Sequence, residues 1–137
     1  MASAFPPDAL TLPVRVTVVG PRRSHEFRCT LDTGASRTVL PTIFLRQLGC
    51  DLSRPVGQTR LRSATGIATV PLIRVAAITA LERVHTEFVV AAHDLPPGIG
   101  ADGLLGLDFF RGLVLTLDFI RGAITLKPPM RWWAFWR

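Results

Sequence analysis

The segment Leu31-Asp32-Thr33-Gly34-Ala35-Ser36, followed closely by Val39-Leu40-Pro41, is the most informative stretch of this 137-residue sequence. An alternating apolar and polar run from His25 to Leu31 leads into it and predicts a half-buried strand. The small and turn-forming residues that follow predict a tight loop presenting Asp32. An Asp-Thr-Gly triplet alone is typical of an ordinary turn, so its meaning depends on the surrounding sequence.

Working outward from this loop, short strands and turns predominate. Val14 to Val19 and His25 to Leu31 are predicted to form a hairpin around Gly20-Pro21, and Pro41 to Gly49 a short helix. Further strands are expected at Thr59–Ala64, Ile67–Leu72, Arg74–Ile78 and Val84–Val90, with a hairpin tip at Thr65-Gly66. A very short apolar strand is expected at Leu104-Leu105-Gly106, followed by a helical turn at Asp108–Gly112. A last hairpin is expected from Val114–Phe119 and Ala123–Leu126. Many short strands with one or two helices indicate a mostly-β, barrel-like domain.

The ordered set of these motifs resembles the retropepsin-like aspartic proteases, the single-domain proteases of retroviral type. Leu31-Asp32-Thr33-Gly34-Ala35-Ser36 and the stretch Gly103-Leu104-Leu105-Gly106-Leu107-Asp108-Phe109-Phe110 carry most of the resemblance, which spans residues 14–127. It implies a closed β-barrel protease domain over 14–127, after a loose lead-in at 1–13 and before a Trp/Arg-rich tail at 128–137. It also implies that the active enzyme is a C2 homodimer and that Asp32 is the catalytic residue.

The resemblance assigns roles to the neighbours of Asp32. Thr33 would hydrogen-bond across the two-fold axis, Gly34 would permit the tight turn, Ala35 would line the cleft floor and Ser36 would bond locally or bind substrate backbone. Leu104, Leu105 and Gly106 would pack under the loop. Arg62 to Val70 would form a flap over substrate, with Ala64, Thr65, Gly66 and Ile67 around its tip. Many relatives have an aromatic residue on the flap, and this chain has none there.

The chemistry requires a second carboxyl group. Two carboxyl groups that share one proton can activate water and protonate the leaving amine, because like charges so close cannot both ionise cheaply. The chain has one Asp-Thr-Gly, so a homodimer is expected to supply the second Asp32. Asp108 is interpreted as a helix cap, Asp118 as a solvent-facing strand residue and Asp94 as a loop acid.

The charge distribution and the cysteine spacing do not favour nucleic-acid binding, a metal site or a disulfide framework. The formal charge is +6, but Lys127, Arg131 and Arg137 contribute half of it from the C-terminal segment, so nucleic acid is not the favoured partner. Cys29 and Cys50 have no metal-ligand spacing, and no metal or cofactor is expected. Cys29 alternates with Phe27 and Leu31, which favours a buried thiol, and a disulfide has no positive support.

The C-terminal tail holds all three tryptophans and leaves three interpretations open: dimer or intradomain packing, a protein partner or substrate groove, and a membrane surface. No signal peptide or membrane span is recognised, which favours the cytoplasm. We expect an endopeptidase that cuts extended polypeptides, with apolar residues around the scissile bond. The alternatives are a non-catalytic dimerisation or peptide-binding module and, from the basic tail, a nucleic-acid anchor.

Overall fold

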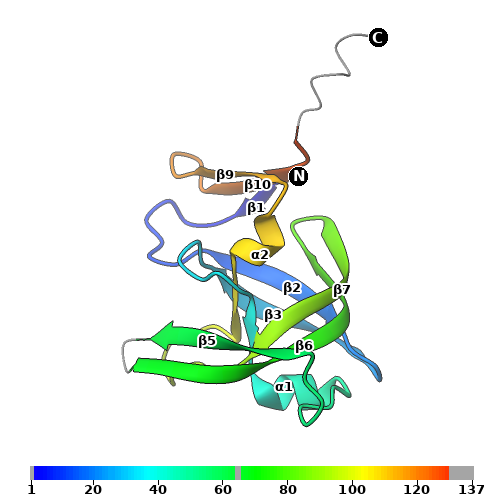
Figure 1. The fold of residues 1–137 in the computed structure, drawn as a ribbon. Helices are drawn as coiled ribbons and strands as arrows, with labels where there is room; N and C mark the ends of the chain where they lie inside the picture. The colour runs from blue at the N-terminus through cyan, green and yellow to red at the C-terminus, as the bar shows by residue number, and fades with distance from the viewer. Residues whose placement is uncertain (1, 64–65, 130–137) are drawn as a thin grey trace, which may run out of the picture.

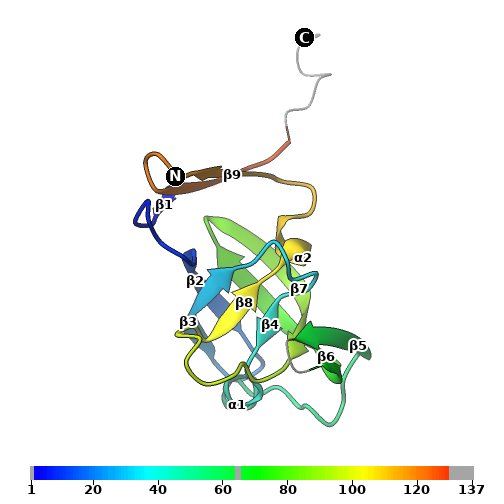
Figure 2. The ribbon, with the colours of Figure 1, turned by 90° about the vertical axis from the view of Figure 1, so that its left-hand side faces the viewer.

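A six-stranded closed barrel forms the body of the protein. The computed structural model describes residues 2–63 and 66–129. The hydrogen-bonded order β2-β3-β8-β4-β7-β6 closes because β6 also pairs with β2, through Thr17↔Thr79 and its neighbours. Figure 2 shows β3, β8 and β4 side by side across this barrel. Its strands are β2 (Pro13–Val19), β3 (Ser24–Leu31), β4 (Val39–Leu40), β6 (Gly66–Ala80), β7 (Arg83–Ala92) and β8 (Gly103–Leu105).

A hairpin projects from the barrel at β5 (Gly57–Ser63) and the first half of β6. The two strands pair antiparallel from Gly57↔Leu72 to Ser63↔Gly66. The predicted strands Ile67–Leu72 and Arg74–Ile78 are in fact one strand of 15 residues, so the predicted break between them is wrong. β6 stays extended because it changes partners there: Leu72 already pairs with both β5 and β7.

Two short helices lie against the barrel. α1 (Thr42–Gln47) begins after Pro41 and ends at Leu48. Gly49 follows with a φ of +93°, a conformation that favours glycine at the end of a helix. α2 (Leu107–Phe110) directly follows β8 and buries Phe109 and Phe110. α1 lies within its predicted segment, whereas α2 begins one residue before the predicted start at Asp108 and ends two residues before Gly112.

A separate three-stranded sheet lies at the other end of the molecule from α1 (Figure 1). Its order is β1-β10-β9, from β1 (Ala2–Ala4), β9 (Val114–Asp118) and β10 (Ala123–Lys127). The N-terminal segment therefore differs from the expected loose lead-in. The reason is Phe5, which is 5% exposed, stacks edge-on against Phe119 and donates its N–H to the Gly122 carbonyl.

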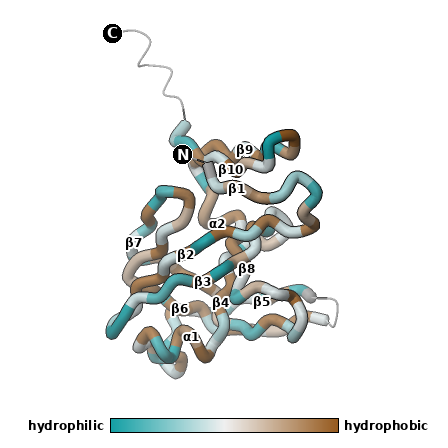
Figure 3. Tube along the Cα trace, turned by 180° about the vertical axis from the view of Figure 1, so that it is seen from behind, coloured by the Kyte–Doolittle hydropathy of each residue, from teal (hydrophilic) through white to brown (hydrophobic). Residues whose placement is uncertain are grey.

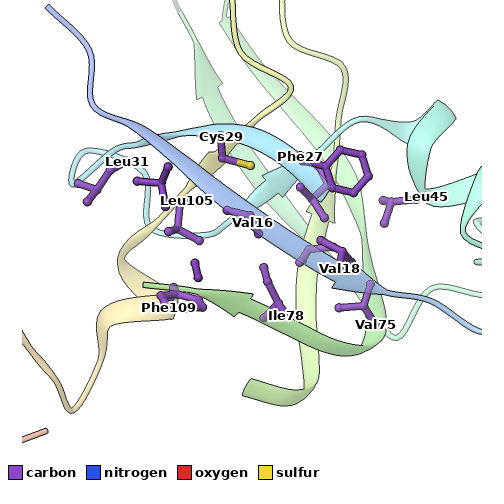
Figure 4. Packing of buried hydrophobic residues seen from close by; sticks show 14 of the residues in the cluster. Val16, Val18, Phe27, Cys29, Leu31, Leu45, Val75, Ile78, Leu105 and Phe109 are labelled. Carbon is purple, nitrogen blue, oxygen red and sulfur yellow. The ribbon is translucent and has the colours of Figure 1, made fainter. Parts of the chain in front are cut away.

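Alternation along the strands fills the barrel with apolar side chains. Val14, Val16 and Val18 of β2 and Phe27, Cys29 and Leu31 of β3 are all buried. Figure 4 shows several of these packed with Ile78, Leu105 and Phe109. Cys29 is a buried free thiol, as predicted, and Cys50 is also free. No helix in the described part of the chain is long and apolar enough to span a membrane.

Candidate active site

Asp32 lies at the point where β3 leaves the barrel. β3 runs parallel to β8, with Leu31 opposite Leu105, and the Asp32 N–H donates to the Leu105 carbonyl at 2.9 Å. This bond extends the β3–β8 ladder by one residue beyond the barrel. The first residue of the candidate loop is therefore fixed by a central strand of the core.

The turn after Asp32 orients its side chain. The Gly34 N–H donates to Asp32 Oδ1 at 2.8 Å, and the Ala35 N–H donates to the Asp32 carbonyl at 3.1 Å. A Cβ at Gly34 would lie 3.1 Å from Oδ1, so glycine leaves room for this carboxylate. Asp32 and Ala35 are half-buried, whereas Thr33, Gly34 and Ser36 are exposed. The turn thus holds one carboxylate oxygen and presents the loop at the surface.

The connection from β8 to α2 lies directly beneath this loop. The Leu107 N–H donates to the Ala35 carbonyl at 2.8 Å. A Cβ at Gly106 would lie 2.5 Å from the Arg37 carbonyl carbon and 2.8 Å from the Ala35 carbonyl oxygen, so only glycine permits this approach. Leu105 is fully buried and Leu104 half-buried. Leu104, Leu105 and Gly106 therefore lie next to the Asp32 loop.

Asp108 does not cap its helix, and this prediction is wrong. The N-cap of α2 is Gly106, and no side chain bonds there. Both oxygens of Asp108 instead accept the Thr38 N–H at 2.9 Å, and Oδ1 accepts the Thr38 hydroxyl at 2.7 Å. The Thr38 partner, 70 residues earlier in the chain, gives no local sequence signal, so sequence reasoning missed both residues.

The remaining late aspartates also bind backbone groups. Asp94 accepts the N–H and hydroxyl of Thr42 and so serves the start of α1, which corrects its interpretation as a plain loop acid. Asp102 accepts the Arg28 N–H at 2.9 Å. Asp118, predicted to face solvent, accepts the N–H groups of Ile120 and Arg121. These bonds, that from Arg121 foremost, lower the pKa of the Asp118 carboxyl.

The β5–β6 hairpin is the candidate flap. Leu61 and Ala68 are cross-strand partners that pack against a second apolar cluster of Val39, Val70, Leu72 and Ala91. Val39 belongs to β4, the strand that follows the Asp32 loop, so the cluster packs the hairpin against that strand. Gly66, with a φ of +131°, and Ile67, 60% exposed, begin β6. Ala64 and Thr65, the other predicted tip residues, lie outside the described residues.

Two open cavities lie elsewhere on the surface. A cavity of about 760 Å³ lies over the outer faces of β2 and β3, lined by Arg15, Arg28 and Glu82 among others. One of about 470 Å³ lies between α1 and the loop before β8, lined by Ile43, Pro97 and Ile99 among others. No group of histidine, cysteine or acidic side chains within 2–63 and 66–129 is arranged to hold a metal ion. Neither of these two cavities is lined by a residue of the Asp32 loop, so that loop is the candidate site on its sequence motif and on the hydrogen bonds described above.

Comparison with known proteins identifies the architecture. Residues 14–109 match a protein family described as aspartyl protease. No curated protein matches the chain. The crystal structure of a retropepsin-like aspartic protease from Rickettsia conorii matches with a TM-score of 0.68 and 18% identity, over 93% of this chain and 89% of that chain. At this identity the match shows a common fold, and it confirms the expected retropepsin-like barrel.

Proposed function

The chain belongs to the aspartyl protease family, and from this premise we propose that it is an endopeptidase whose active site forms between two identical copies, each contributing Asp32. One observation carries the proposal. Asp94, Asp102, Asp108 and Asp118 all accept backbone hydrogen bonds away from the Asp32 carboxylate. Within the described residues, the Asp32 carboxylate bonds only the Gly34 N–H, through Oδ1. The second carboxyl group is therefore expected from a second copy.

The proposed chemistry follows from bringing two such carboxyl groups together. Two negative charges a few ångströms apart repel strongly, so the pair holds one proton into mild acid, and its two titrations belong to the pair. The ionised member takes a proton from water as the water oxygen attacks the peptide carbonyl carbon, and the protonated member stabilises the carbonyl oxygen. Collapse of the tetrahedral intermediate breaks the C–N bond, and a carboxyl proton passes to the leaving amine. No cofactor enters this scheme.

The neighbours of Asp32 support this site in the proposal. Thr33 is exposed on the loop, where its hydroxyl can bond the same loop of the second copy. Gly34 donates to Asp32 Oδ1 and leaves that oxygen uncrowded. Ala35 would form the cleft floor and Ser36 would contact substrate backbone. The β5–β6 hairpin would close over an extended peptide and bond its main chain.

The three-stranded sheet is the proposed site of dimer contact. Among the described residues its order leaves β1 and β9 as edge strands, and an edge strand offers unpaired backbone groups to a second chain. Val114 is 49% exposed on β9, and Phe119 and Ile120 of the β9–β10 turn are 54% and 92% exposed. Figure 3 shows the hydrophobic colour at this turn. A C2 partner would cover such surface.

The test is peptide-library cleavage from about pH 4 to 7, read by mass spectrometry, after sedimentation has established which protein concentrations are dimeric. We expect cleavage by the wild type, strongest in mild acid, and none by Asp32→Asn. The matched control Asp51→Asn changes a surface aspartate that bonds Ser53 and should cleave normally. Adding excess Asp32→Asn to a fixed amount of wild type should suppress cleavage, because mixed dimers hold one aspartate.

Three outcomes would contradict the proposal. Cleavage by pure Asp32→Asn would refute the role of Asp32. Full activity at concentrations where the protein is monomeric would refute the shared site. Absence of cleavage by dimeric wild type would favour the alternative, a retropepsin-fold module that binds peptides or dimerises without catalysis.

A further inference from the structure

Thr38 is an unusual residue for the interior of this protein. It is 0% exposed and is the one polar residue of the described chain that is buried. It lies six residues after Asp32, immediately before β4. A buried hydroxyl and N–H are costly unless both are hydrogen-bonded, so their partners carry information about what this position needs.

The hydroxyl and the backbone N–H of Thr38 are both fully hydrogen-bonded. The N–H donates to Asp108 Oδ1 and Oδ2, both at 2.9 Å. The hydroxyl donates to Asp108 Oδ1 at 2.7 Å and accepts the Gly106 N–H at 3.2 Å. We call this arrangement the Thr38–Asp108 clasp. Bonds to a carboxylate are among the stronger hydrogen bonds in proteins.

The clasp is the last of three attachments between the Asp32 loop and the segment 105–108. The first is Asp32 N–H to the Leu105 carbonyl at 2.9 Å, and the second is Leu107 N–H to the Ala35 carbonyl at 2.8 Å. The loop is thus held at its start, its middle and its end. The clasp is the attachment made through side chains, so it can be changed by substitution while the backbone bonds remain.

Segment 105–108 is itself firmly held to the barrel. Leu105 and Phe109 are 0% exposed. His85 of β7 places Nε2 2.9 Å from the Phe109 carbonyl and packs its ring edge-on against the Phe109 ring at 4.6 Å. Asp108 therefore belongs to a segment that is fixed by packing in the core. Its hydrogen bonds to Thr38 fix the end of the Asp32 loop relative to that segment.

We propose that Asp108 and Thr38 are positioning residues for the Asp32 carboxyl group. This inference rests on the proposed catalytic function of Asp32. Neither residue touches the proposed reacting atoms. They fix the end of the loop so that Asp32 meets the Asp32 of the second copy at the separation at which the pair shares one proton. A displacement of about 1 Å in such a geometry lowers turnover strongly, by up to about 100-fold.

The chemistry of the clasp explains why a carboxylate occupies this position. Each oxygen of Asp108 accepts the same N–H, and an amide would place its NH2 group against that donor. Asp108→Asn therefore keeps the size of the side chain and breaks the fit. Thr38→Val keeps the shape of threonine but removes its hydroxyl, whereas Thr38→Ser retains the hydroxyl.

The experiment measures kcat and KM for these variants under conditions where each is shown to be folded and dimeric. We expect Asp108→Asn and Thr38→Val to lower kcat by about 10- to 100-fold while KM changes less than about threefold. Thr38→Ser should restore kcat to within about threefold of the wild type. A purely structural role would lower stability without this split between kcat and KM.

Asp94→Asn is the matched control. Asp94 accepts the N–H and hydroxyl of Thr42 in a similar pattern, but at the start of α1 and not on the Asp32 loop. We expect it to lower the melting temperature and to leave kcat unchanged. Equal losses of kcat in Asp94→Asn and Asp108→Asn would show a general loss of stability and overturn the proposal.

The outcomes separate this inference from the proposed function. If the wild type is active and folded Asp108→Asn and Thr38→Val have unchanged kcat, the positioning role of the clasp is refuted and the proposed protease function stands. An inactive dimeric wild type overturns both. If Thr38→Val does not fold, Asp108→Glu decides, since it keeps the charge but lengthens the side chain: wild-type kcat in that folded variant would also overturn the proposal.

Discussion

At the scale of single residues, the buried thiol of Cys29 gives the protein a defined response to alkaline pH. The side chain is 0% exposed and lies in the barrel core. Burial, and to a smaller extent the negative charge of Asp102, raises the pKa of the Cys29 thiol from 9.0 to about 12. In the unfolded chain the thiol ionises near its ordinary value. The folded state therefore keeps a proton that the unfolded state loses between about pH 9 and pH 12.

The sign of the stability change follows from linkage. A group whose pKa is raised by folding contributes stability below its unfolded pKa, and that contribution is lost as pH rises through the folded value. We predict that wild type loses about 2 kcal/mol relative to Cys29→Ala between about pH 8 and pH 10.5. Urea unfolding of both proteins at the two pH values measures this, and a constant difference would contradict it.

At the scale of elements, strands whose pattern is local were predictable and those shaped by distant partners were not. The β2–β3 hairpin, α1 and the β9–β10 hairpin follow from alternation, proline and glycine. The predicted strands leave a gap between Ile78 and Val84, but the tight β6–β7 turn there has no local signal. Its central residues are Leu81 and Glu82, both with positive φ, where asparagine or glycine is usual.

The same contrast between local patterns and distant partners holds for the residues of the candidate site. Asp32 and Gly34 are local, since the motif itself makes the turn, and the sequence predicted this turn. The Thr38–Asp108 clasp joins positions 70 residues apart, and Asp94 reaches back 52 residues to Thr42. A single sequence shows an aspartate at a helix start but not which distant N–H it accepts. Such partners depend on the barrel closing.

The β6–β7 ladder contains an irregularity that can be tested. Pairing runs through Val75↔Phe88 and resumes in the same register at Ala77↔Thr86, so Ala76 and Glu87 lie opposite each other but are not paired. Glu87 is exposed and has a φ of +50°, a conformation that costs a residue with a Cβ about 1–2 kcal/mol.

We predict that Glu87→Gly raises the free energy of unfolding by up to about 1 kcal/mol, because glycine adopts this φ without strain. Thr86→Gly, at the adjacent paired and exposed position, should instead lower it by about 0.5–1 kcal/mol. Chemical denaturation compares the two variants with the wild type. Destabilisation by both substitutions would show that the irregularity is not a source of strain.

At the scale of the whole molecule, positive charge is concentrated in the segment that follows Asp32 and includes the candidate flap. Residues 33–81 contain six arginines and one acid, Asp51, which pairs with Arg54 at 3.8 Å. Arg60 and Arg62 are exposed on β5 and have no carboxylate partner within the described residues. Arg60 and Arg62 therefore give the candidate flap strand a locally positive field.

Such a field raises the rate at which oppositely charged ligands meet a site, and salt screens it. We predict that peptides with acidic residues flanking an apolar cleavage site have a kcat/KM about three- to tenfold higher than neutral ones at low salt, with the preference vanishing near 0.5 M salt. Arg60→Gln/Arg62→Gln should remove most of the preference. Arg22→Gln/Arg23→Gln, an equal charge change at the β2–β3 turn, should keep it.

Equal loss in both double variants would mean that net charge, not the position of the flap arginines, governs the encounter. A preference that survives high salt would mean that acidic residues are bound by contact within the cleft.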